Sequence, residues 1–306
     1  RVDRPMRSFF PESDETGSFC RIALLAVGLF GSLSSFAGDL AGSRILATAG
    51  ASTIEGSAGG GITPWAMLAG YGDVGEAGCA GALSQLTTQD YGLNSIGLAC
   101  SFNNRIELSI ARQDLSLNGL RAPLGLRANQ KLRQAVAGVK VRLVGDVVYG
   151  RYGQLSMGVV YKDNLDEPLV TVAGARRTHD VETYLNAGKL FIDGPFGLLA
   201  YVNASVRWTR ANQAGLLGFG GDREQDRSLH PELAGAILPR RDLAIGIEYR
   251  AKPDNLGFAE EEDWHDVFVA WFPNKHISLV AAWVDLGSVG TLRDQNGLYV
   301  SVAGSF

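Results

Sequence analysis

Residues 198–209 alternate between apolar and polar side chains with a period of two, a pattern typical of a β-strand whose two faces differ. One face would carry Leu198, Ala200, Val202, Ala204, Val206 and Trp208, and the other Tyr201, Asn203, Ser205, Arg207 and Thr209. A tilted strand of about a dozen residues is long enough to cross a hydrocarbon layer. The tight turn 193–195 precedes it and the glycine-rich loop 212–222 follows it. This stretch therefore predicts one strand of a membrane-spanning β-barrel.

The remaining chain divides into similar segments, which are separated alternately by short turns and long polar loops. The candidate strands are 62–71, 92–102, 105–114, 134–144, 154–162, 181–192, 197–209, 233–238, 243–250, 265–272, 276–285 and 297–306. Short connections are expected at 103–104, 193–196, 239–242 and 273–275. Bacterial outer-membrane barrels have an even number of strands, short periplasmic turns and longer outer loops. We therefore expect an all-β fold, a transmembrane antiparallel up-and-down β-barrel of about 12 strands with both ends in the periplasm.

Charged residues in the assignable strands fall on the face opposite the apolar one, and we expect them to line the lumen. They are Arg105, Glu107, Lys140, Arg142, Lys162, Arg207, Glu248, Arg250 and Asp266. Facing lipid instead, each would cost several kcal/mol. Six of the nine are basic, so a conducting lumen would weakly prefer anions. Segments 62–71, 181–192 and 276–285 alternate poorly, with Lys189 the clearest exception, and their faces stay unassigned.

Composition favours one large domain in the 306 residues. Hydrophobic residues make up 46% of the chain, yet no run outside 22–37 approaches the roughly 20 apolar residues of a membrane helix. The net charge of −4, without clustered Lys or Arg, argues against nucleic acid as a partner. A soluble β-sandwich would alternate in the same way. It would not require aromatic residues at the ends of its apolar face, so the barrel is favoured.

Residues 1–37 are expected to be a signal peptide with an unusual N-terminal extension. Arg21 precedes the apolar run 22–33, and Ser35 and Ala37 supply the small residues that signal peptidase recognises. The run is too short for the alternative, a membrane anchor. We expect cleavage near Ala37 and, with the barrel pattern, a location in the outer membrane of a Gram-negative bacterium.

Residues 38–61 are rich in glycine and are expected either to plug the lumen or to form a first strand, with the barrel extending over 62–306. The last residue, Phe306, falls on the apolar face of the closing strand. An aromatic residue there is expected to be recognised by the barrel-assembly machinery. The other expected partners are outer-membrane lipid and a small solute.

Three cysteines cannot make a disulfide framework, and Cys79 and Cys100 are not expected to be bridged. In this strand assignment Cys79 lies in the first outer loop and Cys100 near the inner end of the second strand. A disulfide requires Cα atoms within about 7 Å of each other, and the intervening strand would hold these two much further apart.

Motifs that carry chemistry are weak. The glycine-rich tracts 56–61 and 218–221 lack the spacing of a phosphate-binding loop. The acidic stretch 260–263, with His265 and Asp266, has ligands that suit Ca²⁺, although a solvated acidic loop is the simpler interpretation. The chain has four histidines and no G-x-S-x-G motif. We therefore assign no catalytic residue, metal or cofactor, and expect no enzyme.

Three segments resemble a proteobacterial family, domain of unknown function family 3034. They are 47–65 (ATAGASTIEGSAGGGITPW), 211–222 (ANQAGLLGFGGD) and 253–275 (PDNLGFAEEEDWHDVFVAWFPNK). The resemblance covers roughly residues 44–306 and implies an outer-membrane barrel without an assigned activity, so it supplies no catalytic residues.

Two classes of function therefore stay open. The first is a porin-like or narrow solute channel of unknown substrate. The second is a plugged barrel that acts as a structural or interaction protein. An outer-membrane lipid hydrolase is the least favoured alternative, since a Ser/His arrangement is set by geometry rather than by sequence order.

Overall fold

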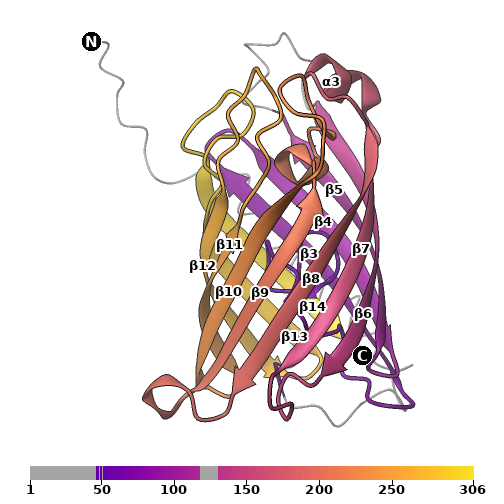
Figure 1. Cartoon of the computed structure of the whole chain (residues 1–306). Coiled ribbons are helices and arrows are strands. Elements are labelled where there is room, and N and C mark those ends of the chain that lie inside the picture. Colours follow the sequence, from indigo (N-terminus) through magenta and orange to yellow (C-terminus); the bar gives the residue numbers. More distant parts are fainter. Residues whose placement is uncertain (1–45, 48, 50, 118–129) are drawn as a thin grey trace, which may run out of the picture. The chain divides into compact units, whose positions relative to one another are not determined.

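Twelve strands form a closed antiparallel barrel in the computed structural model, which describes residues 46, 47, 49, 51–117 and 130–306 (Figure 1). The strands are β3 (Ala77–Thr88), β4 (Gly92–Phe102), β5 (Ile106–Ser116), β6 (Lys131–Gly145), β7 (Gln154–Asn164), β8 (His179–Phe191), β9 (Leu199–Thr209), β10 (Ser228–Arg240), β11 (Leu243–Arg250), β12 (Trp264–Asn274), β13 (Ile277–Asp285) and β14 (Asn296–Ser305). Each pairs with its sequence neighbour, and β14 pairs with β3 to close the ring. The predicted up-and-down barrel is confirmed.

The first predicted strand, 62–71, is wrong. The barrel instead begins with β3, and residues 51–72 are all buried. A buried segment without a lipid-facing side has no reason to alternate, which explains the poor alternation at 62–71. The outward face of β3 carries Cys79, Gly81, Leu83 and Gln85, which are too small or too polar to show the alternation.

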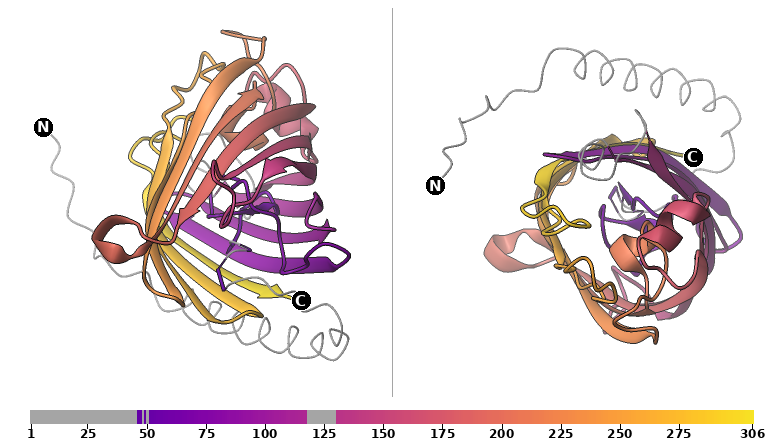
Figure 2. Two further views of the ribbon diagram at one scale, coloured as in Figure 1. Left: turned by 60° about the horizontal axis from the view of Figure 1, so that its bottom comes forward. Right: turned by 90° about the horizontal axis from the view of Figure 1, so that it is seen from above.

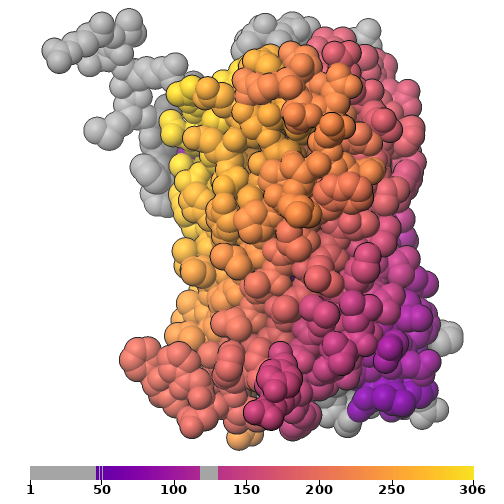
Figure 3. All heavy atoms as spheres, viewed as in Figure 1, coloured from indigo at the N-terminus to yellow at the C-terminus, as the bar shows by residue number. Residues whose placement is uncertain are grey.

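The alternation predicted for the other strands is present. In β9 the side chains of Val202 and Trp208 are exposed on the outer face, whereas those of Asn203 and Arg207 are buried. Neighbouring strands place further apolar side chains on this outer face, as expected for contact with lipid. Among these are Ile96, Leu108, Ile110, Val139, Leu233, Ile247, Val267, Trp271, Trp283 and Leu298. Figure 3 shows the wall from one side, where the strands pack without a break.

Long and short connections lie at opposite ends of the barrel, as Figure 1 shows. One end carries 165–178 with the short helix α3 (Glu167–Val172), 210–227 with η4 (Asn212–Gly215), 251–263 and 286–295. The other carries short turns at 103–105, 241–242 and 275–276, and the hairpin 192–198 with η3 (Pro195–Gly197). We call these the outer and inner ends. No helix in the described part of the chain is both long and apolar enough to span a membrane.

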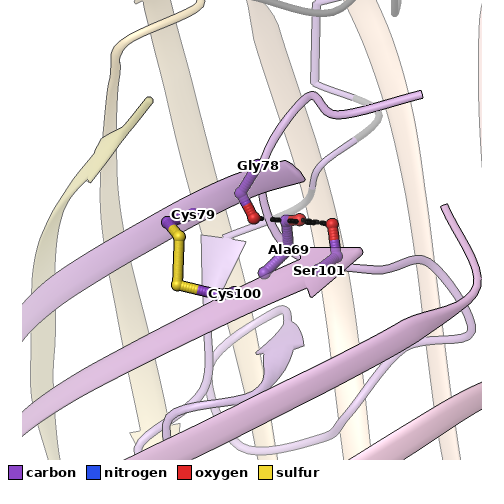
Figure 4. The surroundings of a disulfide bond; sticks show 5 residues. All are labelled: Ala69, Gly78, Cys79, Cys100 and Ser101. Atoms are coloured by element: carbon purple, nitrogen blue, oxygen red, sulfur yellow. Dashed lines mark hydrogen bonds between the residues drawn. A yellow bond between two sulfur atoms is a disulfide. The ribbon is translucent and has the colours of Figure 1, made fainter. Parts of the chain in front are cut away.

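Cys79 and Cys100 form a disulfide, so the prediction that they are not bridged is wrong (Figure 4). The error follows from the misplaced first strand: Cys79 lies near the start of β3 rather than in an outer loop, and it is paired with Cys100, with the Cα atoms 4.0 Å apart. The backbone of Cys79 also exchanges two hydrogen bonds with Phe306, of 2.6 and 2.9 Å. The inner end of the barrel seam is therefore held on both sides of β3.

Candidate functional site

Residues 51–72, which we call the plug, lie inside the barrel (Figure 2, right, indigo). Its strands β1 (Ala51–Ser52) and β2 (Ala58–Gly59) pair with each other and not with the barrel. The plug is held by hydrogen bonds and ion pairs to inward-facing side chains of the wall. It is thus a separately folded segment within the lumen.

Two glycines allow the plug to lie directly against the wall. Gly56 has φ of +88°, and a Cβ at this position would lie 2.7 Å from the carbonyl oxygen of Ile110. A Cβ at Gly60 would lie 2.2 Å from Oε1 of Glu248. A contact that close cannot be accommodated without moving either the plug or a hydrogen-bonded carboxylate. The glycine-rich character of 56–61 is therefore a packing requirement.

Glu55 is the main electrostatic anchor of the plug. Its carboxylate lies 2.8 Å from Nζ of Lys162, 2.7 Å from Nη2 of Arg250 and 3.4 Å from Nη1 of Arg207. These cations come from β7, β11 and β9, so one acidic side chain connects three strands. Burial alone would raise the pKa of Glu55, but Arg250, Lys162 and Arg207 together hold it well below its ordinary range. The plug is therefore anchored by an ionised carboxylate.

Two wall carboxylates complete this cluster. Glu182 on β8 lies 3.0 Å from Lys162 and 2.8 Å from Arg207. Glu232 on β10 lies 2.6 Å from Nε of Arg207 and 3.3 Å from Nε of Arg250. Three acidic and three basic groups thus balance across five adjacent strands, which is the arrangement that buried charges require.

A second anchor joins the plug to β5 and β6. Lys140 and Glu107 form a buried ion pair at 3.2 Å. Lys140 donates to the carbonyl oxygens of Ala58 and Met67, both at 3.0 Å. Glu107 accepts from the backbone N–H of Ala58 at 3.2 Å and of Ala69 at 2.7 Å. This pair therefore binds the plug backbone at two places, at Ala58 and at Met67 to Ala69.

A third anchor is centred on Glu248 of β11. It accepts hydrogen bonds from the backbone N–H of Ile62 and from Nε1 of Trp65, both at 3.0 Å, and from the hydroxyl of Thr63. Two strands away, on β9, Asn203 accepts from the backbone N–H of Ala66 at 2.9 Å. The wall therefore satisfies plug groups that would otherwise be buried without partners.

Seven of the nine residues predicted to line the lumen are buried within the barrel: Glu107, Lys140, Lys162, Arg207, Glu248, Arg250 and Asp266. The other two are not. Arg105 is exposed in the turn before β5, and Arg142 is half-buried near the inner rim, 3.7 Å from Asp146. Alternation assigns Arg105 and Arg142 to the same face as their buried neighbours Glu107 and Lys140. Both lie too close to the inner rim for their side chains to enter the lumen.

Sequence reasoning missed Glu55, Glu182 and Glu232. Glu182 was passed over because Lys189 obscured the faces of its strand; Lys189 faces outward near the inner end and donates to backbone carbonyls of the turn 146–153. Glu232 falls outside the predicted strand 233–238, but the structure begins β10 at Ser228 and so includes it. An isolated acidic residue within a glycine-rich tract was the available signal for Glu55.

These additions change the charge balance of the interior. In the described part of the chain, eight acidic and five basic side chains are buried. They are Glu55, Glu107, Asp180, Glu182, Glu232, Glu248, Glu261 and Asp266, against Lys140, Lys162, Arg207, Arg250 and Lys252. The excess of basic groups on which the anion preference rested is therefore absent.

The acidic stretch 260–263 does not converge on one point. Glu260 pairs with Arg293 at 3.0 Å, Glu261 with Lys252 at 3.1 Å, and Glu262 accepts from the hydroxyl of Ser288 at 2.7 Å. Burial raises the pKa of Glu261, although Lys252 opposes this shift. Within the described ranges, no group of three or more His, Cys, Asp or Glu residues is arranged to hold a metal ion.

One Ser/His pair exists at the outer end of β10. The hydroxyl of Ser228 lies 2.7 Å from Nε2 of His230. In the triad arrangement a third side chain orients the histidine, and the hydrogen bonds of the described residues give His230 no such partner. The pair alone does not support hydrolysis.

The chain matches one protein family, and its fold is similar to that of solved outer-membrane barrels. A family model described as "Protein of unknown function (DUF3034)" matches residues 48–303. No match was found among curated proteins.

Solved structures with similar folds include the KdgM porin, at 12% identity and a TM-score of 0.46, covering 74% of this chain and 99% of that chain. Acinetobacter baumannii outer membrane protein Omp33 matches at 6% identity and a TM-score of 0.44, covering 75% and 97%. The COG4313 outer membrane channel from Pseudomonas putida F1 matches at 13% identity and a TM-score of 0.41, covering 75% and 95%. Scores below 0.5 at such identities carry no information about function.

Proposed function

The chain belongs to the DUF3034 family, and we propose that it is an outer-membrane solute channel, without catalytic activity, whose lumen is closed by its own plug until the plug moves. One observation carries this proposal. A closed barrel with an apolar outer face contains a segment that fills the lumen but adds no strand to the wall.

The outer face supports a location in the outer membrane. A closed barrel leaves no unpaired sheet edge, and with the helix it is the only architecture that satisfies every backbone group in lipid. The exposed side chains along the middle of the strands are apolar, including Ile110, Val202 and Val267. A water-exposed barrel would have no need of such a continuous apolar belt.

The plug is attached in a way that permits movement. The three anchors described above join the plug to side chains of the wall, and the disulfide Cys79–Cys100 lies outside the plug, within the wall. Each plug anchor can therefore be exchanged for water or for a solute group without breaking a strand pairing.

The test is single-channel conductance of the purified protein in planar bilayers. Glu55→Gln leaves Lys162, Arg207 and Arg250 with one carboxylate fewer. Removing one partner from a buried pair costs about 3–5 kcal/mol, and about 1.4 kcal/mol corresponds to a factor of ten. We expect the open probability of Glu55→Gln to exceed that of the wild type at least about 100-fold.

Glu182→Gln is the matched control. It removes the same charge from the same cluster, but Glu182 contacts Lys162, Arg207 and Thr209 rather than the plug. Its open probability should rise much less than that of Glu55→Gln.

A cross-link gives the opposite test. A Cβ built at Gly188 lies 2.9 Å from Cβ of Ala66 in the plug, somewhat closer than the roughly 3.8 Å spanned by a disulfide. Ala66→Cys with Gly188→Cys should therefore tie the plug to β8 after a small shift. Oxidised protein should stay closed even with Glu55→Gln. Conductance that is equal in the cross-linked and reduced forms would show that current does not depend on the plug.

A further inference from the structure

An apolar cavity of about 330 Å³ lies between the plug and the wall at the inner end of the barrel. The wall side is formed by inward-facing residues of β8 to β13 and by residues of the inner-end connections, and the plug contributes Ala51, Gly60, Trp65 and Met67. Among the wall residues are Leu199, Tyr201, Ala236, Leu238, Ala270 and Phe272. A cavity of this volume is at the lower end of the range of small-molecule sites, about 300–1,000 Å³.

Along β10 and β12, the lumen-facing side chains change from charged to apolar. On β12 the buried carboxylate of Asp266 is followed, on the same lumen-facing side and toward the inner end, by Phe268, Ala270 and Phe272. On β10, Glu232 is likewise followed by Ala234, Ala236 and Leu238 on the same face. On β10 and β12 the lumen-facing side chains are therefore charged near the outer end and apolar near the inner end.

Polar groups at the cavity are already engaged, except at its mouth. Nε1 of Trp65 donates to Glu248 at 3.0 Å, and the hydroxyl of Tyr201 donates to Asn203 at 3.3 Å. Arg241, in the turn between β10 and β11, lines the cavity and is exposed. Its neighbour Arg240 pairs with Asp242, but no salt bridge among the described residues involves Arg241.

We propose that this cavity is a binding site for a small aliphatic monocarboxylate, with its hydrocarbon chain among the wall residues and its carboxylate at Arg241. A sugar or an inorganic ion would lose its hydration here without gaining hydrogen bonds, which excludes both. A hydrocarbon chain requires no such partners, and a guanidinium is the donor that suits a carboxylate. The site goes beyond the channel proposal, since binding does not require the plug to move.

The size of the cavity limits the length of the chain. At about 30 Å³ for each water-sized group, the cavity has room for about ten non-hydrogen atoms. Octanoate has this size, and longer acids would have to extend through the inner mouth. We expect affinity to rise with chain length up to octanoate and then to level off.

The experiment is equilibrium dialysis of radiolabelled octanoate against the full-length protein in lipid nanodiscs, with empty nanodiscs subtracted. Wild-type protein should bind octanoate saturably at one site per chain. Ala236→Phe and Ala270→Phe place a ring in the cavity and should each reduce affinity at least tenfold. Two filling variants are used so that a folding defect in one, seen as loss of its heat-modifiable gel band, does not decide the result.

Matched controls separate this cavity from the lipid-facing surface. Ala204→Phe makes the same change on the outer face of β9, where Ala204 is exposed, and should bind like the wild type. Arg241→Gln should weaken octanoate about tenfold and leave octanol unchanged, whereas Arg240→Gln should alter neither. Unchanged octanoate binding in both filling variants would overturn the site. Equal loss of octanoate and octanol in Arg241→Gln would overturn the role assigned to its charge.

Discussion

At the scale of single residues, Glu55 determines how the closed state should depend on pH. Its pKa lies well below the ordinary value of 4.5, because three cations outweigh the effect of burial. A carboxyl group with a lowered folded-state pKa contributes stability above its ordinary pKa and loses it as the pH falls through the folded value. The anchoring of the plug should therefore be complete at neutral pH and fail only in strong acid.

We accordingly predict that the open probability of the wild type stays constant from pH 7 to about pH 5 and rises below about pH 4. The measurement is single-channel recording across this range. Glu55→Gln cannot lose this anchor on acidification, so its open probability should change less. A wild-type channel that opens between pH 7 and pH 5 would show that another group controls the plug.

The disulfide is a second prediction at this scale. Peptide mapping of unreduced protein should recover Cys79 and Cys100 in one cross-linked peptide pair. Opening a natural disulfide typically costs about 2–4 kcal/mol, so Cys100→Ser should unfold at lower temperature than the wild type. Reduction of the wild type should reproduce that shift, and reduction of Cys100→Ser should have no further effect. Free thiols at both positions in unreduced protein would contradict the pairing.

At the scale of elements, eleven of the twelve strands could be recognised. In nine of them lipid on one side and polar groups on the other impose alternation, whereas 181–192 and 276–285 were bounded by the turns and loops beside them. Alternation is absent at both places where the prediction failed. Residues 62–71 face the interior on all sides and so show no alternation. β3 presents Gly81 and Gln85 to the outside and so shows too little contrast.

The lumen was predictable in part for the same reason. Alternation identified Lys162, Arg207 and Arg250 as inward-facing, but it carries no information about what they face. Their partner Glu55 lies more than a hundred residues away in sequence from each of them and belongs to no strand that alternates. Pairing of this kind depends on the closed ring, which brings β7, β9 and β11 around one point.

The position of β3 leads to a prediction about assembly. Leu83, at the middle of β3, faces outward beside Ile96 and Val302. A lysine at the middle of the lipid-facing surface costs about 2–4 kcal/mol, so Leu83→Lys should reduce the fraction of folded, heat-modifiable barrel. Val74→Lys makes the same change in an exposed segment and should have no effect. Normal assembly of Leu83→Lys would mean that this side chain does not face lipid.

At the scale of the whole molecule, the distribution of connections predicts the orientation in the membrane. Outer-membrane barrels have short periplasmic turns and longer outer loops, and here the long loops 165–178, 210–227 and 251–263 share one end. The connection between β3 and β4, residues 89–91, is the short exception at that end. The apolar cavity and Arg241 lie at the other end, so a carboxylate would reach the cavity from the periplasm.

Cysteine labelling of intact cells tests this orientation. The two cysteines of the barrel wall are joined to each other, and the third, Cys20, lies in the expected signal peptide and is replaced by serine for this experiment, so a single introduced thiol provides the signal. Phe258→Cys, in the exposed part of loop 251–263, should react with a membrane-impermeant maleimide, whereas Lys275→Cys, in the turn between β12 and β13, should react only after the outer membrane is permeabilised. Both should react in purified protein, because both positions are exposed to water. If Lys275→Cys were labelled from outside and Phe258→Cys were protected, the barrel would have the opposite orientation, and the apolar cavity would open to the exterior.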